Sequence, residues 1–270
     1  MLRDELERVE AHARAVAALA AERVAIGPFD VFFATDARDA TDATAATDAA
    51  DDGPSYAVPA RPSHDQDVLR RHIAELVEAF RTRGLPPRVE LSLLLWPEMP
   101  QALAASGLTQ IEDSPLFVVT PASFRPRPRA DVGVRWVAPG ESPALTLSIV
   151  RQGFELRGPP PTPEEIEALR ASLDGPLRLA TAERERRPAG AGFSAPVGPT
   201  TEVSGVSTLP QQRRKGVAAA LLSFLVAEHF GSGGDLAWGV ADDPRAAALL
   251  YALGFQDAGL RVGWMLPGDE

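Results

Sequence analysis

The order of strand-like and helix-like segments in the second half of the chain most restricts the fold it can adopt. The segments follow one another as strands at 176–183, 188–197 and 201–209, a helix at about 215–230, a strand at 236–241, a helix at 243–253 and a strand at 255–265. An antiparallel meander is thus followed by alternating helices and strands. This order predicts a mixed α/β fold with a central, partly antiparallel sheet flanked by helices.

The first half of the chain carries a similar but weaker pattern. Its expected elements are strands at 29–35 and 56–60, a helix at about 67–83, a strand at 88–95, a short helix at 99–105 and a strand at 111–119. Residues 34–55 are mostly Ala, Thr and Asp, so we expect a mobile loop or linker there. A proline-rich run at 120–133 is typical of an interdomain linker. We therefore expect a first domain at 1–125, a linker at 126–133 and a second domain at 134–270.

A strand and two helices are expected between this linker and the meander. The strand covers 134–137 and the first helix covers 142–153. The second helix begins after Thr162, and Glu165 follows three residues later, at the spacing of a capping box. We therefore expect the Thr162 hydroxyl to cap this helix.

Composition excludes several kinds of site. The 270 residues include no cysteine, which removes disulfides, thiolate metal ligands and thiol nucleophiles. The four histidines are scattered, and the spacing of His64 and His72 matches no metal motif, so no metal is expected. A formal net charge of −10 disfavours nucleic-acid phosphates and mildly favours an amine-bearing partner. No run approaches the roughly 20 apolar residues of a membrane span, and the N-terminus lacks a signal-peptide core, so we expect a cytoplasmic protein.

A positively charged turn precedes the long apolar helix. The stretch LPQQRRKGVAAALLSFL places Arg213, Arg214 and Lys215 directly before Gly216. The first N–H groups of a helix are unpaired and carry the positive end of its dipole, so such a turn suits an anion. Gly216 and the small Ala218 allow an anion to approach the backbone closely. The turn matches neither the phosphate loop of nucleotide hydrolases nor the dinucleotide fingerprint, and taken alone it is also compatible with a solvated basic helix start.

A second motif strengthens the functional interpretation. About 30 residues after the turn, the stretch AAALLYALGFQ contains Ala247, Tyr251, Gly254 and Phe255. The two motifs in this order resemble the GNAT superfamily of acyl-CoA-dependent N-acyltransferases, over about residues 132–266. In that family a P-x-x-[RQ]-x-x-G-x-[GA] turn binds coenzyme A, and a later helix supplies a tyrosine beside the thioester. This chain departs from the pattern at Ala218, in place of the second glycine, and at Asp243, where many members carry an asparagine that contacts coenzyme A.

The resemblance implies an N-acetyltransferase that uses acetyl-CoA as its cosubstrate. The residues implied in binding it are Val206, Ser207, Thr208, Arg213, Arg214, Lys215, Gly216, Val217 and Ala218. Tyr251 is implied as the acid that protonates the leaving thiolate. Glu202 is the candidate base for the acceptor amine, although a solvated edge carboxylate fits its position equally well. A strictly alternating strand would place Glu202, Ser204 and Val206 on one face, unless a bulge intervenes.

Three functions remain compatible with these residues. The first is acetyl transfer to a primary amine of a small molecule or peptide, by a monomer or homodimer, with no nucleic-acid or membrane partner. The second is a non-catalytic acyl-CoA sensor, which Tyr251 argues against because a pure binder needs no acid for a thiolate. The third is a structural interaction protein whose motifs arose by chance, and it would bind no cofactor.

The two halves of the chain resemble each other when Gly107 is aligned with Gly254. Helix, strand, short helix, glycine and strand then occur in the same order, which indicates a partial internal duplication. Ala104 stands in the first half where Tyr251 stands in the second, and the turn PSHDQD at 62–67 has two aspartates and no glycine. Carboxylates at that position would repel a pyrophosphate. We therefore expect the first half to be a degenerate GNAT-like copy that binds no cofactor, although two ordinary α/β segments could share this pattern by accident.

Overall fold

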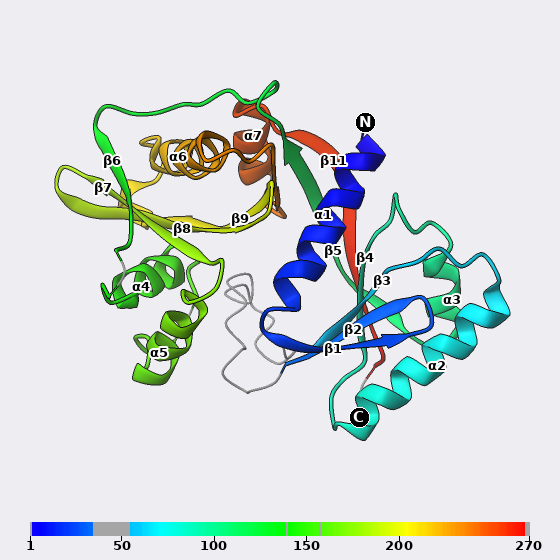
Figure 1. Ribbon diagram of the computed structural model, residues 1–270. Helices are drawn as coiled ribbons and strands as arrows, with labels where there is room; N and C mark the ends of the chain where they lie inside the picture. The colour runs from blue at the N-terminus through cyan, green and yellow to red at the C-terminus, as the bar shows by residue number, and fades with distance from the viewer. Residues whose placement is uncertain (1, 35–54, 139, 157, 268–270) are drawn as a thin grey trace. The chain divides into compact units, whose positions relative to one another are not determined.

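The computed structural model describes most of the chain (Figure 1). The described residues are 2–34, 55–138, 140–156 and 158–267. The prediction of a mobile loop at 34–55 falls almost wholly on residues outside this set. Among the described residues, no helix is both long enough and apolar enough to cross a membrane.

The described residues form two compact units. The N-terminal unit comprises 2–34, 55–116 and 258–267, and the C-terminal unit comprises the described residues of 117–257. This division differs from the predicted boundaries. Residues 117–125, expected in the first domain, and the expected linker both belong to the C-terminal unit, and the last strand of the chain belongs mostly to the N-terminal unit.

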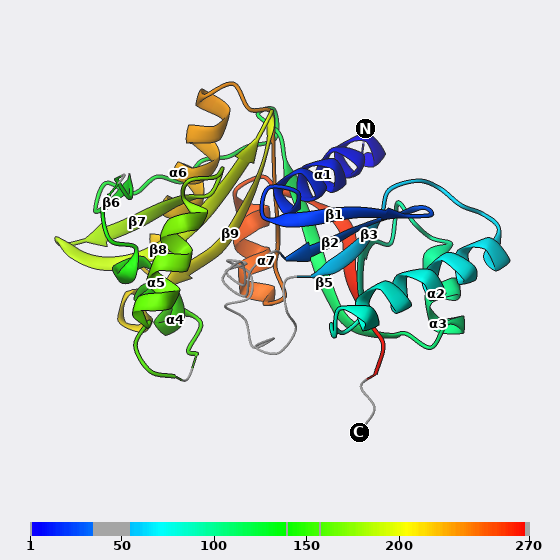
Figure 2. The same ribbon diagram turned by 60° about the horizontal axis from the view of Figure 1, so that its bottom comes forward.

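The N-terminal unit has a mixed sheet in the order β1-β2-β3-β4-β11-β5. Its elements are α1 (Leu2–Ala17), β1 (Ala21–Ile26), β2 (Phe29–Ala34), β3 (Tyr56–Pro59), α2 (Gln66–Thr82), β4 (Arg88–Ser92), α3 (Met99–Ala105), most of β5 (Thr109–Val119) and most of β11 (Gln256–Met265). β1, β2 and β3 are antiparallel, whereas β3 runs parallel to β4. Within this unit, α1 lies on one face of β1 to β3, and α2 and α3 lie on the other (Figure 2).

Helical and strand periodicity together build the core of this unit. The buried residues of α2 recur at spacings of three and four, and they are Leu69, Ile73, Leu76, Val77 and Phe80. Alternate residues of β2 meet them in the same core cluster, namely Phe29, Val31 and Phe33. Full burial of each such side chain stabilises the fold by about 1.5–3 kcal/mol.

A buried ion network holds β11 in the N-terminal unit. Arg261 of β11 donates to Glu90 of β4 (Nη2 to Oε2, 3.1 Å) and to Glu10 of α1 (Nη1 to Oε1, 3.3 Å). Burial alone would lower the pKa of Arg261, but the carboxylates of Glu10 and Glu90 raise it above its ordinary value. Burial raises the pKa of Glu10, although the nearby guanidinium of Arg261 opposes this shift. β11 also pairs with β4 in antiparallel register, which the local sequence pattern does not indicate.

The C-terminal unit has its sheet in the order β5-β10-β9-β8-β7-β6. Its elements are the end of β5, β6 (Val132–Trp136), α4 (Ala144–Gly153), α5 (Pro163–Ser172), β7 (Arg178–Arg184), β8 (Arg187–Val197), β9 (Thr200–Thr208), the 3-10 turn η1 (Pro210–Gln212), α6 (Val217–Gly231), β10 (Leu236–Val240), α7 (Pro244–Ala252) and the start of β11. β6 to β9 form an antiparallel meander, and β10 runs parallel to β9. In Figure 1, α6 and α7 lie side by side on one face of this sheet, and α4 and α5 lie on the other.

The predicted mixed α/β class is confirmed, with a central sheet flanked by helices in each unit. The expected capping box is present, because Thr162 Oγ1 accepts from the Glu165 amide (3.3 Å) and Glu165 Oε2 accepts from the Thr162 amide (2.6 Å). The sequence analysis left β1 unassigned.

The proline-rich run beyond β5 is packed against helices of the C-terminal unit. The Arg125 amide donates to the Leu253 carbonyl (2.8 Å), and the Arg127 amide donates to Ser223 Oγ (2.7 Å). The sequence analysis expected an interdomain linker here, and residues 120–131 form neither helix nor strand, because prolines cannot continue either. It did not indicate that backbone amides between these prolines would find partners on α6 and after α7.

Candidate active site

β9 and β10 pair in parallel only over the first residues of each strand. Thr200, Thr201 and Glu202 oppose the first three residues of β10, whereas β9 continues to Thr208. Among the described residues, no part of β9 beyond Glu202 is in register with β10. The buried hydroxyl oxygens of Ser207 and Thr208 also have no hydrogen-bond partner within the described chain. This end of β9 therefore has capacity to bind a further extended group.

A bulge interrupts β9 before this open end. Ser204 opposes Phe193 of β8, but Ser207 opposes Ala191, so Gly205 and Val206 together face a single residue of β8. Gly205 has φ of 56°, and a Cβ there would lie 2.2 Å from Phe193 Cδ2, so only glycine fits.

The bulge changes which β9 side chains share a face. Val203 and Val206 both pack into the core cluster that contains α6. Strict alternation would have placed Val206 on the same face as Glu202 and Ser204, and the bulge is the exception that the sequence analysis allowed for. Glu202 is half-buried on the other face from Val206.

The basic turn has the backbone geometry of an anion site. Gly216 is the N-cap of α6 with φ of 80°, and no side chain caps this helix. The first backbone hydrogen bond of the helix runs from the Ala220 amide to the Gly216 carbonyl (3.0 Å). In the described part of the chain, no carbonyl accepts from the amides of residues 214–219. A Cβ at Gly216 would lie 3.2 Å from Arg129 Cδ, so glycine leaves room between the turn and that side chain.

The three cations of the turn have different roles. Arg213 forms an ion pair with Glu155 and donates from Nη2 to the Gly153 carbonyl (2.7 Å), so it holds the turn against the end of α4. Lys215 Nζ donates to the Gln211 carbonyl (2.8 Å) and thereby closes the turn on itself. Arg214 is exposed, has φ of 59°, and has no ion-pair partner among the described residues. From the sequence alone, all three cations were expected to add positive charge for an anion, and their separate roles could not be distinguished.

An arginine-lined hollow lies beside the turn. Its volume is about 560 Å³, and it is lined by Pro210, Arg213, Arg214 and Arg245. Arg245 comes from the first turn of α7, whose N-cap Asp243 accepts through Oδ1 from the Arg245 amide (2.8 Å). The sequence analysis missed Arg245, and its only local signal was its position two residues after a helix cap. We refer to this feature below as the arginine hollow.

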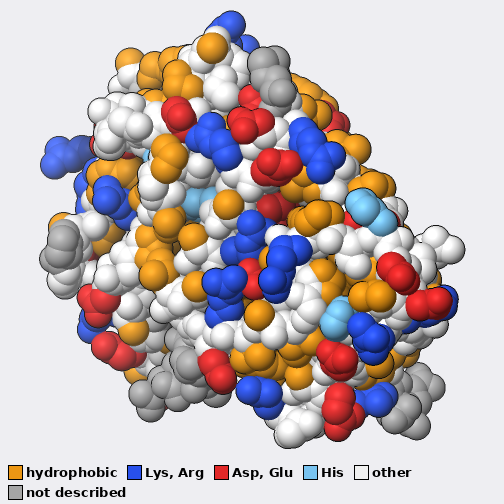
Figure 3. Space-filling model, turned by 45° about the vertical axis from the view of Figure 1, so that its right-hand side comes forward, with side chains coloured by type: hydrophobic (Ala, Val, Ile, Leu, Met, Phe, Trp, Pro, Cys, Tyr) orange, Lys and Arg blue, Asp and Glu red, His pale blue; other side chains and the backbone are white. Residues whose placement is uncertain are grey.

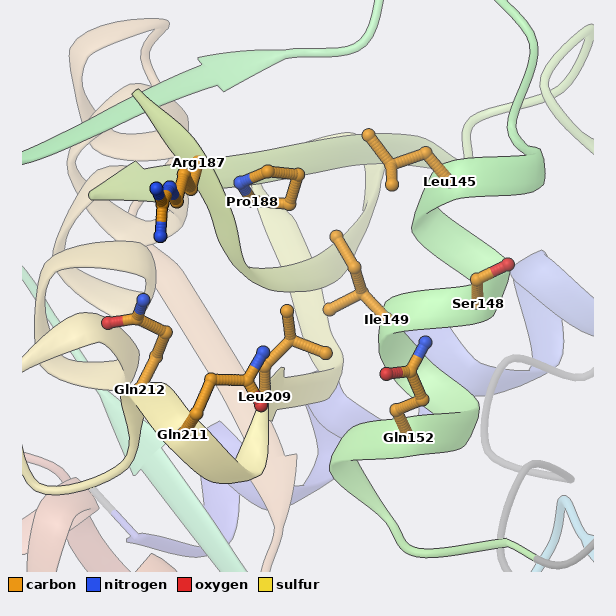
Figure 4. Close-up of a pocket in the computed structure, with 9 residues that line it drawn as sticks. All are labelled: Leu145, Ser148, Ile149, Gln152, Arg187, Pro188, Leu209, Gln211 and Gln212. Carbon is orange, nitrogen blue, oxygen red and sulfur yellow. The ribbon is translucent and has the colours of Figure 1, made fainter. Parts of the chain in front are cut away.

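A second hollow has a different chemistry (Figure 4). It has a volume of about 370 Å³ and lies between α4, the start of β8 and η1. Leu145, Ile149, Pro188 and Leu209 supply apolar surface, and Arg187 is the one charged residue of its lining. This hollow therefore lacks the concentrated positive charge of the arginine hollow.

Tyr251 of α7 has an anchored ring and an accessible hydroxyl. The ring packs edge-on against Phe117, with centroids 5.2 Å apart, and the residue is 52% exposed. Its hydroxyl donates to Asp257 Oδ2 over 3.4 Å, which is a weak hydrogen bond. Within the described chain, no hydrogen bond joins Tyr251 to Glu202. The hydroxyl is thus available to an incoming ligand.

His229 is buried and hydrogen-bonded to the backbone. It is 8% exposed at the end of α6, and its Nε2–H donates to the Pro199 carbonyl (3.1 Å). Burial lowers the pKa of His229 below its ordinary value of 6.5, although hydrogen bonds to nearby carbonyls oppose this shift. A buried, hydrogen-bonded imidazole of this kind is a poor candidate for a catalytic base.

Replacing His229 with glutamine will remove a pH-dependent part of the stability. The folded state favours neutral His229, whereas the unfolded chain takes up the proton at the ordinary pKa, so the stabilisation is complete above pH 6.5. It is lost as the pH falls from 6.5 through the lowered folded pKa. Urea denaturation at a series of pH values should show that, as the pH falls below 6.5, the free energy of unfolding declines less in His229→Gln than in the wild type. An equal decline in both proteins would contradict this assignment.

The N-terminal unit repeats the local structure after the short helix. Gly107 and Gly254 both have φ of 88°. The Leu108 amide donates to the Leu103 carbonyl, and the Phe255 amide donates to the Leu250 carbonyl, both over 3.1 Å. The same helix-ending turn therefore occurs at the positions aligned in the sequence analysis.

The N-terminal unit differs where the C-terminal unit has its basic turn. The first turn of α2 is capped by Asp65, whose Oδ1 accepts from the amides of Asp67 (2.9 Å) and Val68 (3.1 Å). A carboxylate of the chain thus occupies the anion position at this helix N-terminus. Ala104 also lacks the hydroxyl that Tyr251 provides at the aligned position.

Comparisons with known proteins identify the family of the C-terminal half. Residues 146–255 match the model of the Acetyltransferase (GNAT) family. A GCN5-related N-acetyltransferase from Kribbella flavida has a similar structure, with 22% identity, a TM-score of 0.76, and coverage of 98% of this chain and 96% of that one. A second from Sphaerobacter thermophilus has 16% identity, a TM-score of 0.59 and coverage of 80% and 74%.

A solved structure with two GNAT domains in one chain is also similar in fold. A tandem GNAT protein from the clavulanic acid biosynthesis pathway is 13% identical, with a TM-score of 0.59 and coverage of 90% of this chain and 79% of that one. No curated protein matches the sequence. Residues 146–255 therefore match the GNAT acetyltransferase family, and the chain shares its fold with GCN5-related N-acetyltransferases and with a tandem GNAT protein.

Proposed function

We propose that the protein is an acetyl-CoA-dependent N-acetyltransferase that transfers the acetyl group to a primary amine. The observation that carries this proposal is the uncapped N-terminus of α6 at Gly216, which follows directly on the open end of β9. Free amides suit the pyrophosphate of coenzyme A, and an unpaired strand edge suits its amide-containing pantetheine arm. The family match over residues 146–255 supports the same reaction class.

The backbone of the C-terminal unit would hold the cosubstrate. Acetyl-CoA supplies an activated thioester, whose carbonyl carbon the amine attacks directly in a ternary complex. Val206, Ser207 and Thr208 would pair with the pantetheine amides, and an N–H near Val206 would polarise the thioester carbonyl. The amides of Arg213, Arg214, Lys215, Gly216, Val217 and Ala218 would bind the pyrophosphate.

Tyr251 and Glu202 are proposed to move protons. A phenol can protonate a thiolate when it lies within hydrogen-bond reach, and the exposed Tyr251 hydroxyl makes only a weak hydrogen bond to Asp257. The acceptor arrives as an ammonium and must lose a proton before it attacks. Because the bulge puts Glu202 and Val206 on different faces of β9, we propose that Glu202 accepts this proton through a water molecule.

The acceptor is proposed to be a small-molecule or peptide amine, used by a cytoplasmic monomer or homodimer. The net charge of −10 supports a cationic substrate over a nucleic acid. On the face shown in Figure 3, acidic and basic side chains lie side by side, which does not favour a long polyanion. The N-terminal unit is proposed to bind no coenzyme A, because Asp65 occupies the equivalent helix N-terminus.

Release of coenzyme A thiol in the presence of a panel of primary amines tests this proposal. We expect the rate of thiol release to depend on both acetyl-CoA and the amine. Initial-rate plots should give intersecting lines, as a ternary complex requires. Parallel lines would instead indicate an acetylated enzyme and contradict direct attack. Tight binding of acetyl-CoA with no turnover for any amine class would favour the sensor function.

A further inference from the structure

We propose that the hollow between α4, the start of β8 and η1 is a binding site for a small carboxylate with an apolar body. We call it the η1 hollow. Its lining comes from α4, from the start of β8, and from Leu209 and the η1 residues that follow β9. The η1 hollow therefore lies on the β8 side of β9, whereas the proposed cosubstrate site lies on the β10 side. The inference goes beyond the proposed function and does not depend on it.

The floor of the η1 hollow is apolar and belongs to the packed core. Ile149 of α4 and Leu209 are both buried, and they share a core cluster with Phe193 of β8. In Figure 4, the side chains of Ile149 and Leu209 lie at the middle of the hollow, with Leu145 and Pro188 above them. Leu145 and Pro188 are exposed to solvent. A ligand with an apolar body would remove this surface from water.

One side of the η1 hollow carries polar groups that lack partners. Arg187 is exposed, and within the described chain its guanidinium has no ion pair or hydrogen bond. Its near neighbour Glu185 already pairs with Arg184. Gln212 is only 9% exposed; its Oε1 accepts over 3.5 Å from Lys215, but its Nε2 donates to no acceptor of the described residues. In Figure 4, the Gln212 amide and the Arg187 guanidinium lie on the same side of the hollow.

These two groups match a carboxylate. The guanidinium of Arg187 offers forked donors to a carboxylate, and the Gln212 amide adds a neutral N–H donor. The same positive charge disfavours an ammonium, so the η1 hollow is unsuited to the acceptor amine. Its volume of about 370 Å³ is in the lower part of the range for small-ligand sites. The expected ligand is therefore a small monocarboxylate whose apolar part rests on Ile149 and Leu209.

NMR titrations with hexanoate and with hexanamide, in the absence of acetyl-CoA, test this inference. The two probes share one apolar chain and have similar shapes, but only hexanoate is charged at pH 7. For probes of this size we expect a Kd for hexanoate on the order of millimolar. Hexanoate should bind about tenfold more tightly than hexanamide, because its hydrogen bonds to Arg187 are charge-assisted. The amide signals of Leu209 and Gln212 should shift during both titrations.

Arg187→Gln should weaken hexanoate binding about tenfold and leave hexanamide binding unchanged. Arg186→Gln is the matched control, because Arg186 is the adjacent residue, is also exposed and is not among the residues that line the hollow. It removes the same charge from the same hairpin, and its affinity for hexanoate should stay within about twofold of the wild type.

Three results would overturn the inference. The first is equal affinity of the wild type for hexanoate and hexanamide. The second is an equal loss of hexanoate affinity in Arg186→Gln and Arg187→Gln, because the attraction would then come from the general charge of the hairpin. The third is tighter binding of inorganic phosphate than of hexanoate, because the η1 hollow would then recognise charge without an apolar body. A failure of acetyl-CoA to bind would contradict the proposed function and leave these outcomes unaffected.

Discussion

Tyr251→Phe is expected to lower kcat about 100-fold or more at neutral pH, while the affinity for acetyl-CoA changes by less than about twofold. The substitution removes one hydroxyl and keeps the ring that packs against Phe117. Without the phenol, the thiolate must leave unprotonated or take its proton from water. Affinity is spared because the turn at Gly216 and the end of β9 do not depend on this hydroxyl.

Measurements of kcat by thiol release and of affinity by calorimetry check this prediction. Tyr56→Phe is the matched control, because Tyr56 is the other tyrosine of the chain and lies on β3 of the N-terminal unit. Its kcat should stay within about twofold of the wild type. If Tyr251→Phe turned over at the wild-type rate across the pH range, Tyr251 would not be the acid.

Gly216→Asp is expected to weaken acetyl-CoA binding by at least about 100-fold. The new carboxylate would lie at the anion site and repel the pyrophosphate. Any side chain at φ of 80° is also strained, and its Cβ would lie 3.2 Å from Arg129 Cδ. Acetyl-CoA at 100 times its Kd should stabilise the wild type by about 2.7 kcal/mol, which raises Tm by about 5 °C or more.

We predict that acetyl-CoA does not raise the Tm of Gly216→Asp. Gly233→Asp is the matched control, since Gly233 also has positive φ (94°) and lies in open space just beyond the other end of α6. It introduces the same charge and comparable backbone strain away from the turn. It should therefore keep the ligand-induced increase in Tm. If acetyl-CoA raised the Tm of Gly216→Asp as much as that of the wild type, the basic turn would not be the binding site for the pyrophosphate.

Local chemistry explains which parts of the structure the sequence predicted. The apolar spacing in α2 and the capping box at Thr162 depend on neighbouring residues only, and both are confirmed. The role of Gly216 could likewise be predicted from its neighbours, because a glycine between three cations and an apolar helix is typical of an anion-binding turn. The left-handed backbone and the absence of a side-chain cap at this residue agree with that interpretation.

Features that depend on distant partners were not predictable. Arg129 and Arg245 are brought beside the turn by the path of the proline-rich run and by α7. The bulge at Gly205 depends on the ring of Phe193 in β8. β11 pairs with β4, and its Arg261 forms ion pairs with Glu10 and Glu90, which lie far away in the sequence.

Calorimetric titration of the wild-type protein with acetyl-CoA tests the central claim most directly. The account places one cosubstrate site in the C-terminal unit and none in the N-terminal unit, so it predicts one molecule bound per chain with Kd on the order of micromolar. Two sites per chain would contradict the assignment of Asp65 as the group that occupies the equivalent helix N-terminus. No binding at all would contradict the acetyltransferase function and leave only the shared fold.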